Sequence, residues 1–472
     1  MVGNDIYNIT CRDHPLHNSF IIPVNNDFLI YSPLNGISAL INRAGVLELN
    51  TQLKLIEKNK GNPESMLFEL AQDILQKPVL TPVKKTGDLN PEFIGLIPTR
   101  ICNGACNYCD FEAEKASHDK MPYNMAVKIV DWYAGLLKSR QRKVLEVQFF
   151  GGEPMMARDV IEVTVQRARM VATEQNLVPF FEISTNGQYN AKNARFLGQY
   201  FNKVVLSLDG FKEIQNKHRP LKNNQSSFEN AVETAKIISI SDAELCIRCC
   251  ISQINIELME DITQWFCQVL RPSAINFEVL CSTPKTDSTG LFPPDPVSFA
   301  IHFQKSREIA NGFGVEVVYA SDISEQPVVS SCPVGKDTVI VSPDGRISNC
   351  YLIPDRWQKK GLDLDFGFLD SNGEVRIEND KITAIREMVE CKPRCRKCFC
   401  QWSCAGGCHV GTTYPGSSLE YNDFCKQTRL ISTFTLLSDL GLQDKIEELI
   451  LIPDALQKIV NQSSDRIQTF KQ

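Results

Sequence analysis

The sequence predicts an α/β fold centred on a parallel, curved sheet of about six β/α units. Apolar runs of strand length alternate with amphipathic stretches through the middle of the chain. Segments rich in proline and polar residues bound this alternating region on both sides. The chain has 472 residues, of which 43% are hydrophobic, and this is enough for about two to four domains with real cores.

The first expected strand is a short apolar run, the other expected strands are short segments rich in apolar residues, and each expected helix has apolar residues at helical spacing. The expected strands are residues 93–98, 144–150, 180–184, 204–208, 245–251 and 274–280. The expected helices include residues 125–137, 159–173 and 228–238. In a β/α barrel the chemistry is carried by loops at the carboxyl ends of the strands, so functional residues are expected there.

Turn-rich segments divide the chain into parts. Residues 77–90 and 281–296 have the composition of linkers. Beyond the cysteine-rich last third, residues 430–450 have helical apolar spacing. The expected parts are residues 1–88, 89–295, 296–430 and a helical tail, 431–472.

The part before the sheet is expected to be a small unit of its own. Residues 19–32 have the pattern of a β-hairpin that turns at Asn25 and Asn26. Helices are expected at residues 36–48 and 64–75. A hairpin followed by helices predicts a winged-helix-like module, and the alternative is an extension that caps the barrel.

Three cysteines follow the first expected strand, as Cys102-x3-Cys106-x2-Cys109. A structural zinc site takes four protein ligands, and a [4Fe-4S] cluster has four irons to satisfy. A set of three therefore leaves one metal position open to another ligand. A partial zinc site is the alternative interpretation.

Polar and glycine-rich residues follow the next three expected strands. Glycines without a Cβ let a ligand approach the backbone closely, and short polar side chains can bind it by hydrogen bonds. Arg219 could pair with a ligand carboxylate through two hydrogen bonds, and Arg248 is the alternative for this role. The candidate binding residues are Gly151, Gly152, Glu153, Ser184, Asn186, Ser207, Asp209 and Arg219.

A second cysteine array lies in the last third of this chain of 18 cysteines. It comprises Cys332, Cys350, Cys395, Cys398, Cys404, Cys408 and Cys425. Pairs of the Cys-x2-Cys type also hold zinc in small modules, which is the alternative for this region.

The cysteine loop, with Tyr108 before its last cysteine, resembles that of radical S-adenosylmethionine (SAM) enzymes. The order of Gly151-Gly152-Glu153-Pro154 and the later strand-end residues is similar to the SAM-binding pattern of that family. The resemblance implies a partial (β/α)6 TIM barrel. It also implies a [4Fe-4S] cluster on Cys102, Cys106 and Cys109 that cleaves SAM to a 5'-deoxyadenosyl radical, which abstracts a substrate hydrogen. Tyr108 joins the implied SAM-binding residues.

The second array resembles the SPASM domain of a branch of these enzymes, which carries two auxiliary [4Fe-4S] clusters. The resemblance implies that one auxiliary cluster, the distal one, is held by Cys395, Cys398, Cys404 and Cys425. It implies that the cluster nearer SAM is held by Cys332, Cys350 and Cys408. The fourth position of the nearer cluster is open, or is filled by substrate, Cys281, Cys391 or Cys400.

Charge and segment composition narrow the possible partners. The net charge of -6 argues against general nucleic-acid binding. No apolar signal segment or membrane-spanning run is evident, and oxygen-sensitive cluster motifs fit a reducing compartment, so a cytoplasmic protein is expected. The resemblance implies a flavodoxin or ferredoxin as reductant.

The function expected from the resemblance is maturation of a precursor peptide or protein by cross-linking, excision or oxidation, as in ribosomal-peptide (RiPP) maturases. The N-terminal hairpin could capture a leader peptide by strand addition. A sulfatase-maturing, formylglycine-generating enzyme is an alternative, although Tyr351 stands where those enzymes have a catalytic aspartate. A small-molecule radical dehydrogenase and a non-catalytic iron-sulfur or zinc scaffold are the others.

Overall fold

The computed structural model describes residues 15–109, 111, 119–223, 225–323, 326–370, 372–390, 393–411 and 421–461. A large sheet has the strand order β10-β9-β8-β7-β6-β5-β4-β11-β12-β13-β14. All neighbouring strands from β10 to β11 are parallel, and those from β11 to β14 are antiparallel. The prediction of an α/β fold with a parallel sheet is therefore confirmed.

The six expected strands are present, with small changes at their ends. They are β4 (Ile94–Leu96), β5 (Val144–Phe149), β6 (Val178–Thr185), β7 (Lys203–Ser207), β8 (Glu244–Ile251) and β9 (Ala274–Val279). Fully buried and half-buried residues alternate along β5 and β6, which is the pattern of a strand with one face in an apolar core.

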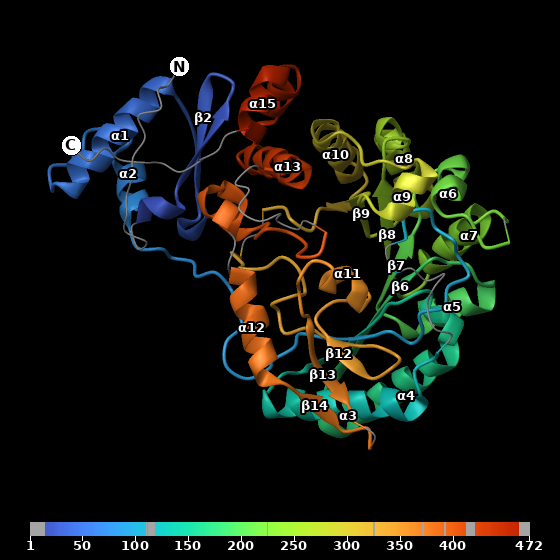
Figure 1. Ribbon diagram of the computed structural model, residues 1–472. Coiled ribbons are helices and arrows are strands. Elements are labelled where there is room, and N and C mark those ends of the chain that lie inside the picture. Colours follow the sequence, from blue (N-terminus) through green and yellow to red (C-terminus); the bar gives the residue numbers. More distant parts are fainter. Residues whose placement is uncertain are drawn as a thin grey trace.

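Most helices of the barrel region lie on the outside of the curved sheet (Figure 1). They are α3 (Tyr123–Ser139), α4 (Arg158–Gln175), α5 (Ala191–Tyr200), α6 (Lys212–His218), α7 (Phe228–Ile238), α8 (Met259–Trp265) and α10 (Pro296–Asn311). The short helix α9 (Pro284–Thr289) follows β9 and contacts the cysteine loop, because the Thr289 hydroxyl donates to the Asn107 carbonyl at 3.3 Å. α9 lies within the segment that was expected to be a linker, and its first turn is capped by the Thr283 side chain.

The C-terminal part extends the barrel sheet. β11 (Val339–Val341) pairs in parallel with β4, and β10 (Glu316–Val318) pairs with β9 at the opposite end. The remaining elements are β12 (Arg346–Ser348), β13 (Asp365–Leu369), β14 (Val375–Ile377), α11 (Pro354–Gln358), α12 (Asn379–Glu390), α13 (Asp423–Asp439), α14 (Gln443–Ile450) and α15 (Pro453–Asn461). The helical spacing at residues 430–450 is confirmed by α13 and α14, which are separated where Gly441 adopts a positive φ of 71°.

The N-terminal unit is a three-stranded antiparallel sheet of β1 (Phe20–Val24), β2 (Asp27–Ser32) and β3 (Ile37–Asn42). It is followed by α1 (Arg43–Glu57) and α2 (Phe68–Leu75). The helix expected at residues 36–48 begins too early, because residues 37–42 form β3 and pair with β2, and α1 starts only at Arg43. The Asn42 side chain caps α1 by accepting from the Gly45 amide at 2.8 Å.

The N-terminal sheet has two buried faces. Ile30 packs with Leu49 and Leu53 of α1 in a small separate core. Phe20 and Ile22, on the other face, belong to the main core together with residues of α15. In Figure 1 the N-terminal unit, in blue, accordingly lies beside the red helices α13 and α15.

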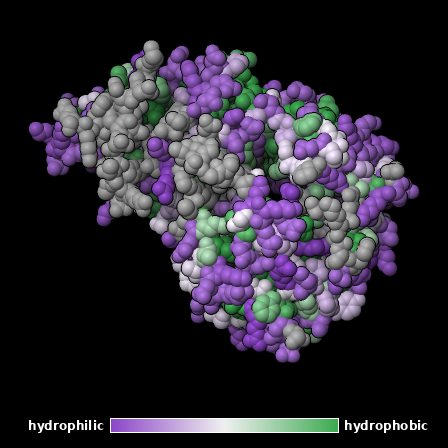
Figure 2. All heavy atoms as spheres, viewed as in Figure 1, coloured by the Kyte–Doolittle hydropathy of each residue, from purple (hydrophilic) through white to green (hydrophobic). Residues whose placement is uncertain are grey.

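Figure 2 shows that hydrophilic side chains dominate one face of the molecule, with green hydrophobic areas small and separate. Across the described residues, none of the helices combines the length and apolar character needed to cross a bilayer.

Candidate functional site

Backbone contacts hold the cysteine loop after β4 against the glycine pair that follows β5. The Glu153 amide donates to the Ile101 carbonyl at 2.8 Å, and the Gly152 amide donates to the Thr99 carbonyl at 3.2 Å. A Cβ added at Gly152 would lie 2.3 Å from the carbonyl oxygens of Arg100 and Ile101. Glycine at this position therefore lets two strand-end loops pack backbone to backbone.

The three thiols of the loop lie in one electrostatic neighbourhood. Burial raises the pKa of the Cys102 thiol to about 12, and the charges of Cys106 and Cys109 act in the same direction. Burial likewise raises the pKa of Cys106 to about 11. The Gly104 amide donates to Cys102 Sγ at 3.3 Å. Thiolates in such surroundings need a positive partner, which an iron centre would supply.

Glu153 is 1% exposed and joins the β5 loop to the end of β6. Its carboxylate accepts from the Thr185 hydroxyl at 2.8 Å, the Asn186 amide at 2.7 Å and the Met155 amide at 3.1 Å. Burial raises the pKa of this carboxyl to about 7 in spite of these hydrogen bonds. Its three hydrogen-bond donors are protein groups from both loops, so it organises the loops of the site.

Asn186 connects the end of β6 with the cysteine loop. Its Nδ2 donates to Asn103 Oδ1 at 2.9 Å and lies 3.6 Å from Cys102 Sγ. Asn103 in turn donates to the carbonyl of Gln188 at 2.9 Å. Thr185, Asn103 and Gln188 were not among the predicted residues, although their positions beside predicted ones at strand ends were a usable signal.

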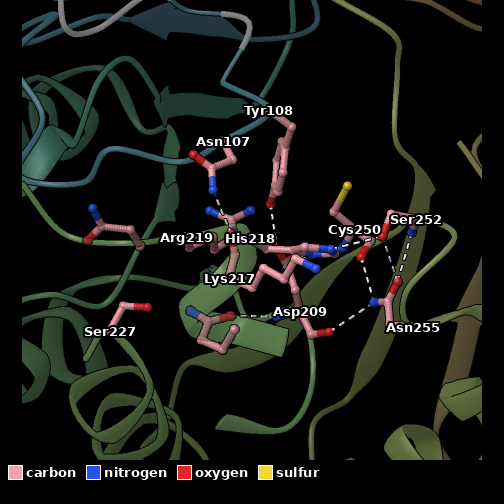
Figure 3. A network of polar contacts seen from close by, with 12 residues as sticks. Asn107, Tyr108, Asp209, Lys217, His218, Arg219, Ser227, Cys250, Ser252 and Asn255 are labelled. Carbon is pink, nitrogen blue, oxygen red and sulfur yellow. Dashed lines mark hydrogen bonds and ion pairs between the residues drawn. The ribbon is translucent and has the colours of Figure 1, made fainter. Parts of the chain in front are cut away.

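Asp209 is fully buried at the end of β7 and lies at the centre of a polar network (Figure 3). Its Oδ2 accepts from the Tyr108 hydroxyl at 2.7 Å and from Arg219 Nε at 3.0 Å, and lies 3.2 Å from His218 Nδ1. Its Oδ1 accepts from the Cys250 amide at 3.0 Å. Burial favours a raised pKa for Asp209, but Arg219 and His218 outweigh it and lower the pKa well below the usual range.

The network holds the side chains of Tyr108 and Arg219, two of the predicted site residues, in position. The Arg219 guanidinium lies 5.2 Å from the centre of the Tyr108 ring, and its side chain is 13% exposed. His218 meets the same ring edge-on at 5.7 Å and lies 2.9 Å from the Ser252 hydroxyl. Asp209 is bonded to Nε of Arg219, and neither Nη group donates a hydrogen bond to another described residue.

The other polar candidates lie on the neighbouring strands. Arg248 on β8 forms an ion pair with Glu278 on β9, so this alternative to Arg219 has a carboxylate partner within the protein. Ser184 and Ser207 are half-buried at the ends of β6 and β7. In the part of the chain that the structure describes, neither hydroxyl has a hydrogen-bond partner.

The C-terminal cysteines form two groups. A hydrogen bond with Cys408, together with burial and the charge of Cys350, raises the pKa of Cys332 well above its usual value. Burial followed by the charges of Cys395, Cys425 and Cys398 raises the pKa of Cys404. Members of each predicted ligand set therefore interact with one another, and the distal group also includes Cys400.

The candidates for the fourth ligand of the nearer cluster are spread out. The buried Cys400 thiol is hydrogen-bonded to Cys398 and interacts with Cys404, so it lies with the distal group. Cys281 is exposed just after β9, and Cys391 lies outside the described residues. Among the residues that the structure describes, no group of three or more His, Cys, Asp or Glu side chains converges on a single-ion site. The fit to iron-sulfur clusters therefore rests on the all-thiol donor sets and their grouping.

Tyr351, which directly follows Cys350, packs on the inner side of the sheet. Its ring lies 4.8 Å from the Phe150 ring, and its hydroxyl donates to Gln148 Oε1 at 3.4 Å. A Cβ added at Gly95 would lie 2.4 Å from the Tyr351 hydroxyl oxygen. A glycine in β4 thus makes room for this aromatic side chain.

Residues 96–257, which include the cysteine loop and the Asp209 network, match the family model described as the radical SAM superfamily. The chain contains a radical SAM domain. The resemblance stated from the cysteine loop is confirmed, and the cysteine-rich C-terminal region is consistent with a SPASM domain. A radical SAM domain binds SAM and a [4Fe-4S] cluster, and it indicates that the chain is an enzyme.

Two curated enzymes are similar to this chain in sequence. A cysteine-type anaerobic sulfatase-maturating enzyme of Clostridium perfringens strain 13 is 23% identical over 353 residues, which cover 69% of this chain and 90% of that enzyme. The radical SAM cyclopropyl synthase TigE of Paramaledivibacter caminithermalis is 26% identical over 157 residues, which cover 31% of this chain and 32% of TigE.

The solved structure of anSMEcpe with bound AdoMet and a Cp18Cys peptide is similar in fold. It is 19% identical, with a TM-score of 0.60, and the match covers 76% of this chain and 100% of that one. The chain is therefore a radical SAM enzyme related to sulfatase maturases, and a solved structure of the same fold holds a peptide.

Proposed function

We propose that this radical SAM enzyme modifies a peptide or protein after its synthesis. The observation that carries the proposal is the match over 90% of a sulfatase-maturating enzyme, which covers 69% of this chain and is longer than the radical SAM domain. A peptide-bound structure of the same fold supports it. Small-molecule dehydrogenation has no comparable support among these relatives.

In this proposal, Cys102, Cys106 and Cys109 hold a [4Fe-4S] cluster whose fourth corner is left for SAM. When bound, the cluster and SAM supply a 5'-deoxyadenosyl radical that can abstract a substrate hydrogen. The protein's own groups bind and orient SAM. Gly151 and Gly152 pack closely against the cysteine loop, and we propose that the amino group of SAM lies beside them.

The Nη groups of Arg219 are the proposed donors to the SAM carboxylate, because Asp209 holds the guanidinium through Nε alone. Ser184 and Ser207 are proposed to bind the ribose and methionine parts through their hydroxyls. Asn186 and Tyr108 line the same site and keep the cysteine loop in position. Precise placement of SAM brings the target hydrogen close to the radical.

We further propose that the two C-terminal thiol groups hold auxiliary [4Fe-4S] clusters. Cys395, Cys398, Cys404 and Cys425 would form the distal set, and Cys332, Cys350 and Cys408 the nearer set. Auxiliary clusters would accept the electron that remains after substrate oxidation or bind the substrate. A flavodoxin or ferredoxin is the proposed reductant, in a cytoplasmic setting.

We propose four parts, with the boundaries expected from the sequence: residues 1–88, 89–295, 296–430 and 431–472. The first part would bind a leader peptide at the outer edge of β3. This strand pairs with β2 on one side, and no further strand follows it in the N-terminal sheet of the described residues. A leader could add a strand there through main-chain hydrogen bonds.

Sulfatase maturation is the second candidate, favoured by the same curated relative. Its weakness is Tyr351, a half-buried phenol that makes aromatic contacts where a catalytic carboxylate would be needed. A phenol of raised pKa is a poor general base at neutral pH.

The test is to incubate the reconstituted enzyme, SAM and dithionite with a cysteine-containing sulfatase peptide and, separately, with peptides encoded beside its gene. The proposal expects a mass change in an adjacent-gene peptide and no aldehyde in the sulfatase peptide. Aldehyde formation would instead establish sulfatase maturation. SAM cleavage without a change in any of these peptides would contradict peptide modification.

A further inference from the structure

A fully buried arginine on α13 points at the distal thiol group. Arg429 is 1% exposed, and its Nη1 donates to Cys398 Sγ at 3.5 Å. Its Nε and Nη2 donate to the Ile459 carbonyl of α15, at 2.9 and 2.6 Å. Three nitrogen donors of the Arg429 guanidinium are thus bound by two acceptors, the Cys398 thiol and a carbonyl of α15.

Two aromatic rings fix the plane of the Arg429 guanidinium. Its central carbon lies 4.4 Å from the centre of the Tyr421 ring and 4.8 Å from that of Phe399. A guanidinium lying between rings and held by a carbonyl has little freedom to turn. The donor aimed at Cys398 is therefore held in place before any cluster binds.

An arginine remains charged in proteins, and burial of a charge is costly unless opposite charge and hydrogen bonds compensate it. A cluster held by four thiolates carries net negative charge, which increases by one on reduction. A positive group that donates to a ligand sulfur stabilises the reduced form more than the oxidised form. Hydrogen bonds to sulfur and local charge are among the factors that set cluster potentials.

We infer that Arg429 is a positioning residue for the distal auxiliary cluster and raises the reduction potential of that cluster through its bond to Cys398. The inference rests on the proposed function, which places that cluster on Cys395, Cys398, Cys404 and Cys425. α15 takes part, because its Ile459 carbonyl receives two of the donors. A raised potential suits a cluster that accepts an electron from an oxidised substrate.

The experiment is a redox titration followed by electron paramagnetic resonance on the full-length, reconstituted protein. Cys102, Cys106 and Cys109 are replaced by alanine throughout, so that only auxiliary clusters contribute. Arg429→Gln is expected to lower the midpoint of one auxiliary signal by at least a factor of ten in the reduction equilibrium, which is 59 mV for one electron. Arg429→Lys, which keeps the charge, should recover part of the shift.

Arg307→Gln is the matched control. Arg307 also bonds to α13, through Thr435 at 2.7 Å, but its other partner is Asp322 and it makes no contact with a thiol in the described residues. This variant should disturb α13 packing and leave both midpoints unchanged.

Equal midpoints in the parent, Arg429→Gln and Arg429→Lys proteins would overturn the inference while leaving the auxiliary clusters in place. A similar shift in Arg307→Gln would overturn it too, since packing alone would then explain the effect. If Arg429→Gln loses iron, the midpoint of Arg429→Lys is compared with that of the parent protein instead. A lowered midpoint supports the inference, and an unchanged midpoint overturns it. A parent protein without auxiliary clusters would overturn the proposed cluster and this inference together.

Discussion

The Tyr108 hydroxyl donates a 2.7 Å hydrogen bond to Asp209 Oδ2, which ties the cysteine loop to the end of β7. The same oxygen accepts a hydrogen bond from Arg219 Nε, as Figure 3 shows. A buried carboxylate thereby sets the position of an aromatic ring beside the thiols and of an arginine next to them. The Asp209 side chain therefore holds two residues of the site, Tyr108 and Arg219, in position.

Replacement of Asp209 by asparagine should remove the charge partner of Arg219 and cost about 3 kcal/mol of the free energy of unfolding. SAM affinity should fall at least about tenfold, because Arg219 is no longer held in place. Tyr108→Phe, which removes one hydrogen bond to the same charge, should cost less, about 1.5 kcal/mol. Denaturant unfolding and equilibrium dialysis of SAM measure both effects. Equal SAM affinity in all three proteins would contradict the positioning role.

The cost of Asp209→Asn should depend on pH in a defined direction. The folded-state pKa of Asp209 lies below its unfolded value of about 3.9, so its stabilisation is present above that pH and is lost only in stronger acid. The difference in unfolding free energy between the two proteins should therefore stay constant from about pH 5.5 to pH 8 and shrink below about pH 4. A difference that disappears near neutral pH would show that the carboxyl is not ionised in the folded protein.

Gly152→Ala should damage the cysteine loop. The added Cβ would meet the carbonyl oxygens of Arg100 and Ile101 at 2.3 Å, and these backbone atoms can move only with the loop. We expect a loss of about 1–3 kcal/mol and less iron after reconstitution. Gly135→Ala in α3 is the control, because nothing lies within 4 Å of its added Cβ and alanine favours a helix by up to about 1 kcal/mol. Full iron in Gly152→Ala would argue against close contact of the two loops.

Cys404→Ala and Cys400→Ala should behave differently in iron counting. Cys404 interacts with the three other members of the proposed distal set, so its loss should remove about four irons. Cys400 bonds to Cys398 but lies outside the assigned set, and its loss should leave the count unchanged. If Cys400→Ala alone loses the irons, the assignment of the distal ligands must be exchanged between these two residues.

The barrel strands were predictable because each is a short segment rich in apolar residues, as Leu245–Ile251 within β8 illustrates, with Arg248 as its single charged residue. β3 was missed because residues 37–42 also fit helical spacing, and only pairing with β2 decides between the two. Continuation of the sheet from β4 into β11 depends on pairing of Val339 with Ile94, far apart in sequence, which no local pattern contains.

The cysteine loop and Asp209 could be picked out by spacing and position, but the partners of Asp209 could not. Arg219 appeared as a candidate for the SAM carboxylate, and its ion pair with Asp209 became evident only once α6 was placed. The part of Thr185 in binding Glu153 was equally hidden, because a threonine at the end of a strand has many possible roles.

The most direct test of the central claim is anaerobic reconstitution followed by dithionite-driven cleavage of SAM. The natural chain is compared with a variant in which Cys102, Cys106 and Cys109 are replaced by alanine. The account predicts 5'-deoxyadenosine from the natural chain only, and about four fewer irons in the variant. No 5'-deoxyadenosine from a natural chain loaded with iron and sulfide, or equal amounts from both proteins, would contradict it.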